Sequence, residues 1–213
     1  MDAIPLGRVL GIPLFASWSA FFILALVVLR NGTDSPSALA TGLLYGVAVF
    51  GSILVHELGH AIVGRRLGLR PQGILLHGFG GLCQYGRSPR PSEGVYSSAA
   101  GPAAGLALGV VAWVVNLALG GMLPHQVGWL LKQLVWINIF WSLFNLLPMY
   151  PLDGGHLLWY GLRLKVPGGR AWKITRWVGI ATAVLVALGG LATGMTFVLL
   201  VAGLSLMELI RKE

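Results

Sequence analysis

His56 and His60 have the residue type and the spacing needed to bind one metal ion, and Glu57 between them has a side chain that can move a proton. An α-helix advances about 100° and 1.5 Å per residue, so His56 and His60 lie on one face and can bind a single ion. Neutral imidazole is a favoured zinc ligand, and Glu57 can lie beside the attacking water and accept its proton. The segment His56-Glu57-Leu58-Gly59-His60 therefore predicts zinc-dependent hydrolysis.

The surroundings of this segment strengthen that interpretation. It lies in an apolar run from about Ala38 to Val63 that contains no other charged residue. Ionisable side chains are costly inside a bilayer, so those found in an apolar span are functional candidates by default. The pattern fixes only three residue types, so it also arises by chance. The alternative is that the two histidines only form hydrogen bonds with neighbouring helices.

The composition predicts an all-α polytopic membrane protein with about six transmembrane helices. Of the 213 residues, 56% are hydrophobic and 10% are charged, which leaves too little polar surface for a soluble globule. No long linker, repeat or low-complexity tract interrupts the chain, so we expect a single transmembrane domain over residues 1–213. The first apolar stretch is expected to stay as an anchor, since no small-residue cleavage pattern follows it. The stretches lie at about 12–29, 38–63, 95–119, 127–147, 171–192 and 194–210, with a shorter one after Asp153.

The basic residues predict the orientation of these spans. If the N-terminus is cytoplasmic, six crossings place every lysine and arginine on the cytoplasmic side except Arg30 and Lys132. This distribution follows the positive-inside rule and predicts that both termini are cytoplasmic. The net charge of +8 is then explained by basic loops that face an anionic leaflet, and nucleic acid is not an expected partner. The absence of a eukaryotic targeting cue favours a prokaryotic cell membrane.

A third metal ligand is expected from the segment around Asp153. Catalytic zinc sites usually have three protein ligands and one exchangeable position. The carboxylates other than Glu57 and Asp153 lie at termini, in loops or at the end of a span. Near Asp153, Pro148 and Pro151 break the preceding helix, and two glycines allow a close approach of the backbone. Asp153 is therefore the natural partner of the two histidines.

Two alternatives for this segment stay open. Asp153 could instead cap the N-terminus of a short helix that begins near Gly154. His156 could be the third ligand, since imidazole also binds zinc, or it could be a polar helix residue near the interface. His77 and His125 have no partner at a metal-binding spacing, and we expect them in loops or at the membrane interface.

The segment Gln72–Tyr85 is apolar and rich in glycine but too short to cross a membrane as a helix. We interpret it as a short membrane re-entrant β-hairpin beside the active site. A transmembrane substrate must unwind locally before cleavage, and its freed backbone groups could pair with the edge of this hairpin. We therefore expect substrate binding at Gly78, Phe79, Gly80 and Gly81. The alternative is an interfacial turn without a role in substrate binding.

Several of these motifs together resemble the site-2 protease family of intramembrane zinc metalloproteases. The paired metal motifs carry the resemblance: residues 56–60, and residues 145–155 with the order Asn145, Pro148, Leu152-Asp153-Gly154-Gly155. The glycine-rich segment 78–81 and Ala100-Gly101-Pro102, where small residues let helices pack closely, are also similar. The resemblance covers nearly the whole chain.

The resemblance implies an endopeptidase that cleaves a peptide bond in or near the transmembrane segment of a single-span membrane protein, within regulated intramembrane proteolysis. We expect a minimal form without a PDZ or CBS module, so selection of substrates would come from the membrane core or from a regulatory membrane partner. The implied site has one Zn²⁺ per chain on His56, His60 and Asp153, with Glu57 as the catalytic acid and base and Asn145 beside the reacting carbonyl.

Two other functions are compatible with a metal site in a membrane. A zinc transporter can also carry histidines and carboxylates on spanning helices, but its pathway should have polar residues at several depths. The chemistry-bearing residues of this chain gather at one depth, beside a candidate base. A non-catalytic membrane metal-binding protein would have no need of Glu57. Both alternatives are less favoured than a protease.

Overall fold

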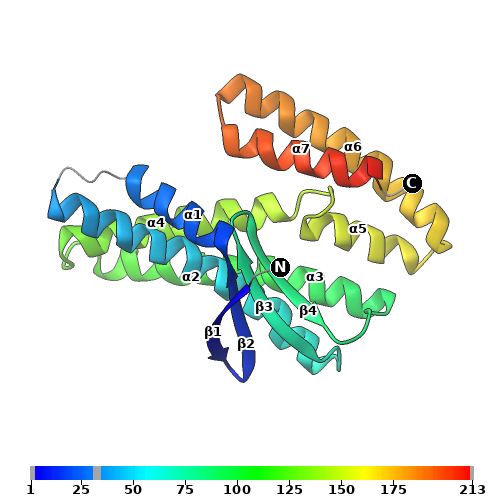
Figure 1. Ribbon diagram of the computed structural model, residues 1–213, viewed down its shortest axis with the longest axis horizontal. Helices are drawn as coiled ribbons and strands as arrows, with labels where there is room; N and C mark the ends of the chain where they lie inside the picture. The colour runs from blue at the N-terminus through cyan, green and yellow to red at the C-terminus, as the bar shows by residue number, and fades with distance from the viewer. Residues whose placement is uncertain (1–2, 31–34, 212–213) are drawn as a thin grey trace. The chain divides into compact units, whose positions relative to one another are not determined.

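The computed structural model describes residues 3–30 and 35–211, and most of these are helical (Figure 1). The described residues form two compact units. The first contains the chain up to Ser88 together with Ala100–Ser142, and the second contains Pro89–Ala99 and the chain from Leu143 onward.

The first unit contains a four-stranded sheet in which two antiparallel hairpins are joined by a central parallel pair. The parallel pair places Leu14 of the second strand opposite Ile74 of the third. The first and fourth strands therefore form the two edges of the sheet. In chain order the strands are β1 (Ala3–Val9), β2 (Ile12–Ser17), β3 (Pro71–His77) and β4 (Gly80–Tyr85).

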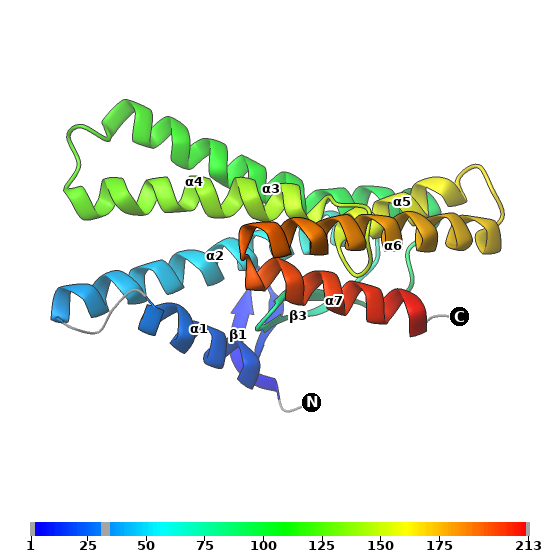
Figure 2. The same ribbon diagram turned by 90° about the horizontal axis from the view of Figure 1, so that it is seen from above.

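Helices link and cover the strands of this sheet. α1 (Trp18–Arg30) and α2 (Pro36–Arg66) connect β2 to β3, as a parallel pair requires, because its strands cannot be joined by a tight turn. α3 (Pro91–Leu119) and α4 (His125–Asn145) follow the sheet in sequence. Figure 2 shows that α2 and α4 run in the same direction and that α3 runs in the opposite direction.

α2 packs against β3 and β4 and supplies the helical side of the core. Alternate residues of a strand point to the same face, so β2 and β3 each bury every second apolar side chain against the helix. This core binds α2 to the sheet and fixes which face of the helix is covered. Its buried members are Ile12, Leu14, Ile53, Ala61, Ile74 and Leu76.

Local signals set the two ends of α2. The Ala38 amide donates to the Ser35 side chain at 3.2 Å, and Pro36 occupies the first turn, where a missing N–H costs no helical hydrogen bond. Arg65 and Arg66 lie in the last turn, where positive charge complements the helix dipole. The helix therefore has defined ends and 31 residues, and it holds the His56 segment in its C-terminal half.

The second unit is helical. α5 (Asp153–Arg163) packs on α6 (Gly168–Thr193), and α6 packs on α7 (Thr196–Arg211). α6 ends at Gly194, which has a φ of 69° and so adopts the left-handed conformation that glycine tolerates. The buried core of this unit contains Phe144, Met149, Ala183 and Val201.

The predicted helical character is confirmed for most of the described residues, whereas the count of six spans is not. Helices occur in all six stretches that the composition predicts as spans. Within the described ranges, four helices are long and apolar enough to cross a membrane, namely α2, α3, α4 and α6. α7 has 16 residues, and α1 has 13, which corresponds to about 20 Å against a hydrocarbon core of about 30 Å.

The prediction of one helical span over residues 12–29 is wrong in its first part, and the fold is not all-α. Residues 12–17 form β2, because Ile12, Leu14 and Ala16 alternate with outward-facing residues and are buried in the sheet. β1 and β2 were not predicted. They form a local hairpin with each other, and the pairing that joins this hairpin to the rest of the sheet is with β3, more than fifty residues later in the sequence. The predicted hairpin at 72–85 is present as β3 and β4.

Gly64 allows β4 to lie against α2, and its replacement tests that contact. A Cβ at Gly64 would come 3.0 Å from Cζ of Tyr85, whose hydroxyl donates to the His60 carbonyl at 3.0 Å. We expect Gly64→Ala to lower the melting temperature in detergent, since overpacking costs about 1–3 kcal/mol. The matched control is Gly51→Ala in the same helix, where nothing lies within 4 Å of the added Cβ, and it should keep or raise the melting temperature. Equal melting of the two variants would contradict this packing.

Candidate metal centre

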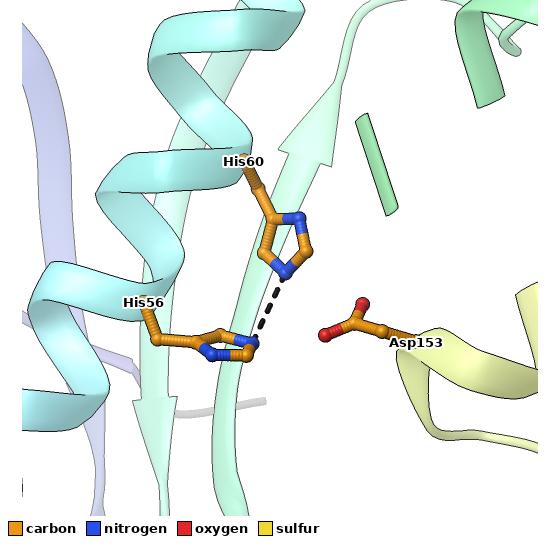
Figure 3. Close-up of side chains that lie close together, drawn as sticks. All are labelled: His56, His60 and Asp153. Atoms are coloured by element: carbon orange, nitrogen blue, oxygen red, sulfur yellow. Dashed lines mark hydrogen bonds between the residues drawn. The ribbon is translucent and has the colours of Figure 1, made fainter. Parts of the chain in front are cut away.

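α2 presents two buried imidazoles from adjacent turns. His56 and His60 are 4% and 8% exposed, and their Nε2 atoms lie 3.2 Å apart (Figure 3). Two nitrogens bound to one tetrahedral zinc ion at about 2.05 Å are separated by about 3.3 Å. The spacing of the two Nε2 atoms therefore fits a shared zinc ion.

Gly101 of α3 keeps open the space beside these imidazoles. A Cβ at Gly101 would come 2.7 Å from Nε2 of His56 and closer still to Nε2 of His60. Gly59 has a similar role on α2, because its Cβ would come 2.7 Å from that of Ala104. Any side chain at Gly101 would fill the position toward which both nitrogens point. The donor set and this glycine cradle together fit a bound metal ion.

Glu57 lies on the neighbouring face of α2, against β4. Glu57 is 5% exposed, and a Cβ added at Gly81 would come 2.7 Å from the Oε1 atom of Glu57. β4 therefore runs directly past the carboxylate that the sequence predicts as the base.

The other residues of the predicted substrate-binding segment form the turn of the hairpin. Gly78 donates its amide to the Ser19 hydroxyl at 3.1 Å, so it packs against α1. Gly80 has a backbone φ of 137°, a conformation that residues with a side chain rarely adopt. Phe79 is 45% exposed. Of this segment, Gly81 is the residue that the structure places against Glu57.

Cys83 follows on β4 and is half-buried. Burial, together with the nearby Glu57 carboxylate, raises the pKa of its thiol to about 12. The thiol therefore stays protonated at neutral pH.

Asp153 is the first residue of α5, and the N-cap position belongs to Leu152. The alternative that Asp153 is the N-cap is therefore wrong. The N-terminus of α5 is packed closely against the preceding loop, since a Cβ at Gly155 would come 2.7 Å from the backbone of Met149. Asn145 ends α4, so one tight loop of the second unit fixes both Asn145 and Asp153.

The remaining histidines have other surroundings. Nδ1 of His156 lies 3.1 Å from the Leu152 carbonyl, and its ring centroid is 4.3 Å from that of Tyr150. His77 ends β3, where its Nδ1 accepts from the Phe79 amide at 3.3 Å, and His125 begins α4. These positions agree with the expectation that His77 and His125 lie at loop or interface positions.

Sequence reasoning did not find the role of Gly101. The motif Ala100-Gly101-Pro102 was attributed to helix packing, and the structure shows that its glycine also borders the two imidazoles. The available signal was the presence of a glycine at position 101. Nothing in the sequence says which helix faces His56 and His60, so that signal could not be interpreted before the fold was known.

Comparison with known proteins gives a consistent match. The model of "Peptidase family M50" matches residues 44–128 and 120–188. Rip3 of Mycobacterium tuberculosis, which is named as a zinc metalloprotease, is 34% identical over 91% of this chain and 54% of its own length. The zinc metalloprotease MJ0392 of Methanocaldococcus jannaschii is 29% identical over 94% of this chain and 57% of its own length. The chain thus spans little more than half the length of these relatives.

A solved structure agrees with these relatives. The site-2 protease from Methanocaldococcus jannaschii superposes with a TM-score of 0.71 at 25% identity, over 99% of this chain and 94% of that one. Zinc is the metal that these similarities imply, and the paired imidazoles beside Gly101 fit it. The sequence match, the fold and the donor set agree, and the chain belongs to peptidase family M50.

Proposed function

We propose that the protein is an intramembrane zinc endopeptidase that hydrolyses a peptide bond in or near the transmembrane segment of a membrane protein. The observation that carries this proposal is the pair of buried imidazoles, 3.2 Å apart, with the buried Glu57 between them in sequence on an apolar helix. Membership of family M50 supports it. A zinc transporter is not favoured, because a passage for ions does not need a base packed beside a strand.

His56, His60 and Asp153 would hold the zinc ion, each offering one ligand atom. Two neutral imidazoles and one carboxylate match the ligand sets of catalytic zinc sites, which keep one position open. When bound, zinc acts as a Lewis acid that polarises a carbonyl group and lowers the pKa of water toward about 7.

Glu57 would move the proton during hydrolysis. Its carboxylate accepts a proton from the attacking water as the new C–O bond forms, and it returns that proton to the amine as the C–N bond breaks. Burial of Glu57 keeps bulk water away from this exchange. The Asn145 amide would donate a hydrogen bond to the carbonyl oxygen as negative charge develops there.

The free edge of β4 would hold the substrate in an extended form. β4 is a terminal strand of the sheet, so one side of its backbone has no strand partner within the described residues. An unwound substrate segment can form main-chain hydrogen bonds with such an edge. Gly81 lies against Glu57, so a strand added to β4 would pass close to the base. The exposed side chains of Phe79 and Leu82 offer apolar contacts to that segment.

Six crossings with both termini in the cytoplasm complete the proposal. Four helices have the required length and composition, and the shorter α1 and α7 would make the first and last crossings. The basic residues of the loops support this orientation. A prokaryotic cell membrane, a single-span substrate and a regulatory membrane partner belong to the same proposal. The two chain ends lie outside the described residues, and the single domain over residues 1–213 stays a prediction.

Glu57→Gln separates proton transfer from metal binding. We expect this variant to retain about one zinc per chain and to lose at least about a hundredfold in the rate of cleavage of single-span proteins, since the amide cannot accept the proton. Zinc content and cleavage would be measured on the detergent-purified protein. The matched control is Glu93→Gln, because Glu93 accepts the Arg90 amide at the start of α3 and its amide counterpart can still accept. Near-normal cleavage by Glu57→Gln would disprove the assigned role.

Asp153→Asn tests the third ligand against its rival. We expect this variant to lose at least about tenfold in zinc affinity, because a neutral amide replaces a charged carboxylate ligand. His156→Gln should bind zinc as the parent does, since the His156 ring is engaged with Leu152 and Tyr150. Affinity would be measured by competition with a chelator. The reverse order of the two effects would assign the third ligand to His156.

Leu82→Ser tests the edge of β4 as the binding surface for substrate. Leu82 is 48% exposed on β4, and Leu6 on the opposite edge strand β1 is also 48% exposed, which makes Leu6→Ser a matched control. Burying a leucine side chain contributes about 1.5–3 kcal/mol, so we expect Leu82→Ser to lower kcat/KM about tenfold with zinc content unchanged. Equal losses in the two variants would argue against docking of substrate at β4.

A further inference from the structure

A buried hydroxyl on α4, that of Ser142, has no place in the proposal above. Ser142 is 0% exposed, and among the residues that the structure describes its Oγ atom has no hydrogen-bond partner. A buried polar group left unpaired costs about 1–3 kcal/mol. Proteins commonly satisfy such groups with a buried water molecule. The Ser142 hydroxyl therefore marks a position where a hydrogen-bond partner, such as a buried water molecule, is expected.

A neighbouring hydrogen bond places Ser142 at the level of His56. The Asn138 amide of α4 donates to the Ser52 hydroxyl of α2 at 2.9 Å, and both residues are buried. α2 and α4 run in the same direction (Figure 2). His56 follows Ser52 by four residues, and Ser142 follows Asn138 by four residues, which is about one turn in each helix. The next turn therefore brings Ser142 opposite His56.

The backbone of α3 passes both residues, at positions one turn apart. A Cβ at Gly105 would collide with Oγ of Ser142, and a Cβ at Gly101 would come 2.7 Å from Nε2 of His56. Positions four apart in a helix have Cβ atoms about 5–6 Å apart. The serine hydroxyl and the imidazole thus border neighbouring turns of one face of α3.

We propose that Ser142 shares a buried water molecule with Nδ1 of His56 and so positions this imidazole for metal binding. The Nε2 atoms of His56 and His60 face each other, which makes the buried Nδ1 the outer nitrogen of the His56 ring. A metal-binding histidine donates its other N–H to an acceptor, which fixes the tautomer and the ring orientation, and loss of that acceptor costs about 10–100-fold in metal affinity. Ser142 is in this sense a positioning residue, and the proposal rests on the zinc site of the proposed function.

Ser142→Ala is the decisive variant, with Ser97→Ala as its control. Ser97 is also a buried serine, but its hydroxyl donates to the Gly94 carbonyl within α3. We expect Ser142→Ala to lower zinc affinity about tenfold in chelator competition, and to shift the visible absorption of the Co²⁺-substituted protein. Ser97→Ala should change neither. Ser142→Cys retains a weak acceptor of similar size and should fall between the parent and the alanine variant, which also covers the case of an alanine variant that does not fold.

The outcomes distinguish this proposal from the proposed function. Unchanged zinc affinity and Co²⁺ spectrum in Ser142→Ala would overturn the positioning role, and a raised melting temperature alone would show that the hydroxyl is only a buried polar defect. If the parent binds zinc and Glu57→Gln abolishes cleavage, the proposed function stands in either case. If the parent binds no zinc, both proposals fail.

Discussion

The close packing of backbone around two buried imidazoles is the constraint on which the rest of the structure depends. His56 and His60 leave no room for a side chain at Gly101, and Glu57 leaves none at Gly81. Each glycine comes from a different element, one from α3 and one from β4, so α2 is enclosed on two faces by backbone. Side chains lose mobility in such an enclosure, and their polar atoms are removed from bulk water. Imidazoles and a carboxylate held in this way are preorganised, which is how buried sites obtain strong electrostatic effects.

The small sheet gives this mostly helical protein a structural feature that helices alone do not provide. A helix satisfies its own backbone, so it offers few main-chain hydrogen bonds to a partner, whereas an edge strand offers a row of them. The core of Ile12, Leu14, Ile74 and Leu76 anchors the sheet on α2, which keeps β4 at a fixed distance from Glu57. The same core explains why residues 12–17 are extended although their composition is that of a span. Burial against α2 and pairing with β3 outweigh the local preference.

A row of buried polar residues accompanies the two histidines along the helices of the first unit. Ser52, His56 and His60 follow one another at four-residue steps on α2, and Asn138 and Ser142 do so on α4. Apolar side chains at these positions would carry no desolvation penalty, whereas each buried polar group costs free energy unless it forms a hydrogen bond. The bond from Asn138 to Ser52 shows that part of this penalty is offset by a link that fixes the register of α2 and α4. Asn138 thus has a structural role in linking α4 to α2.

The sequence by itself determined the apolar helices of membrane-spanning length, the shared face of the two histidines on α2, the hairpin at 72–85 and the short helix from Asp153, because these depend on composition and on spacing within one element. It could not determine β1 and β2, the place of Gly101 beside the imidazoles, or the level of Ser142, because these depend on which elements meet. Helical spacing says that His56 and His60 share a face, but it does not say what covers that face. Only the tertiary structure placed the glycines of α3 and β4 against these α2 side chains. A glycine has no side chain whose chemistry would indicate, from the sequence, which residue it contacts.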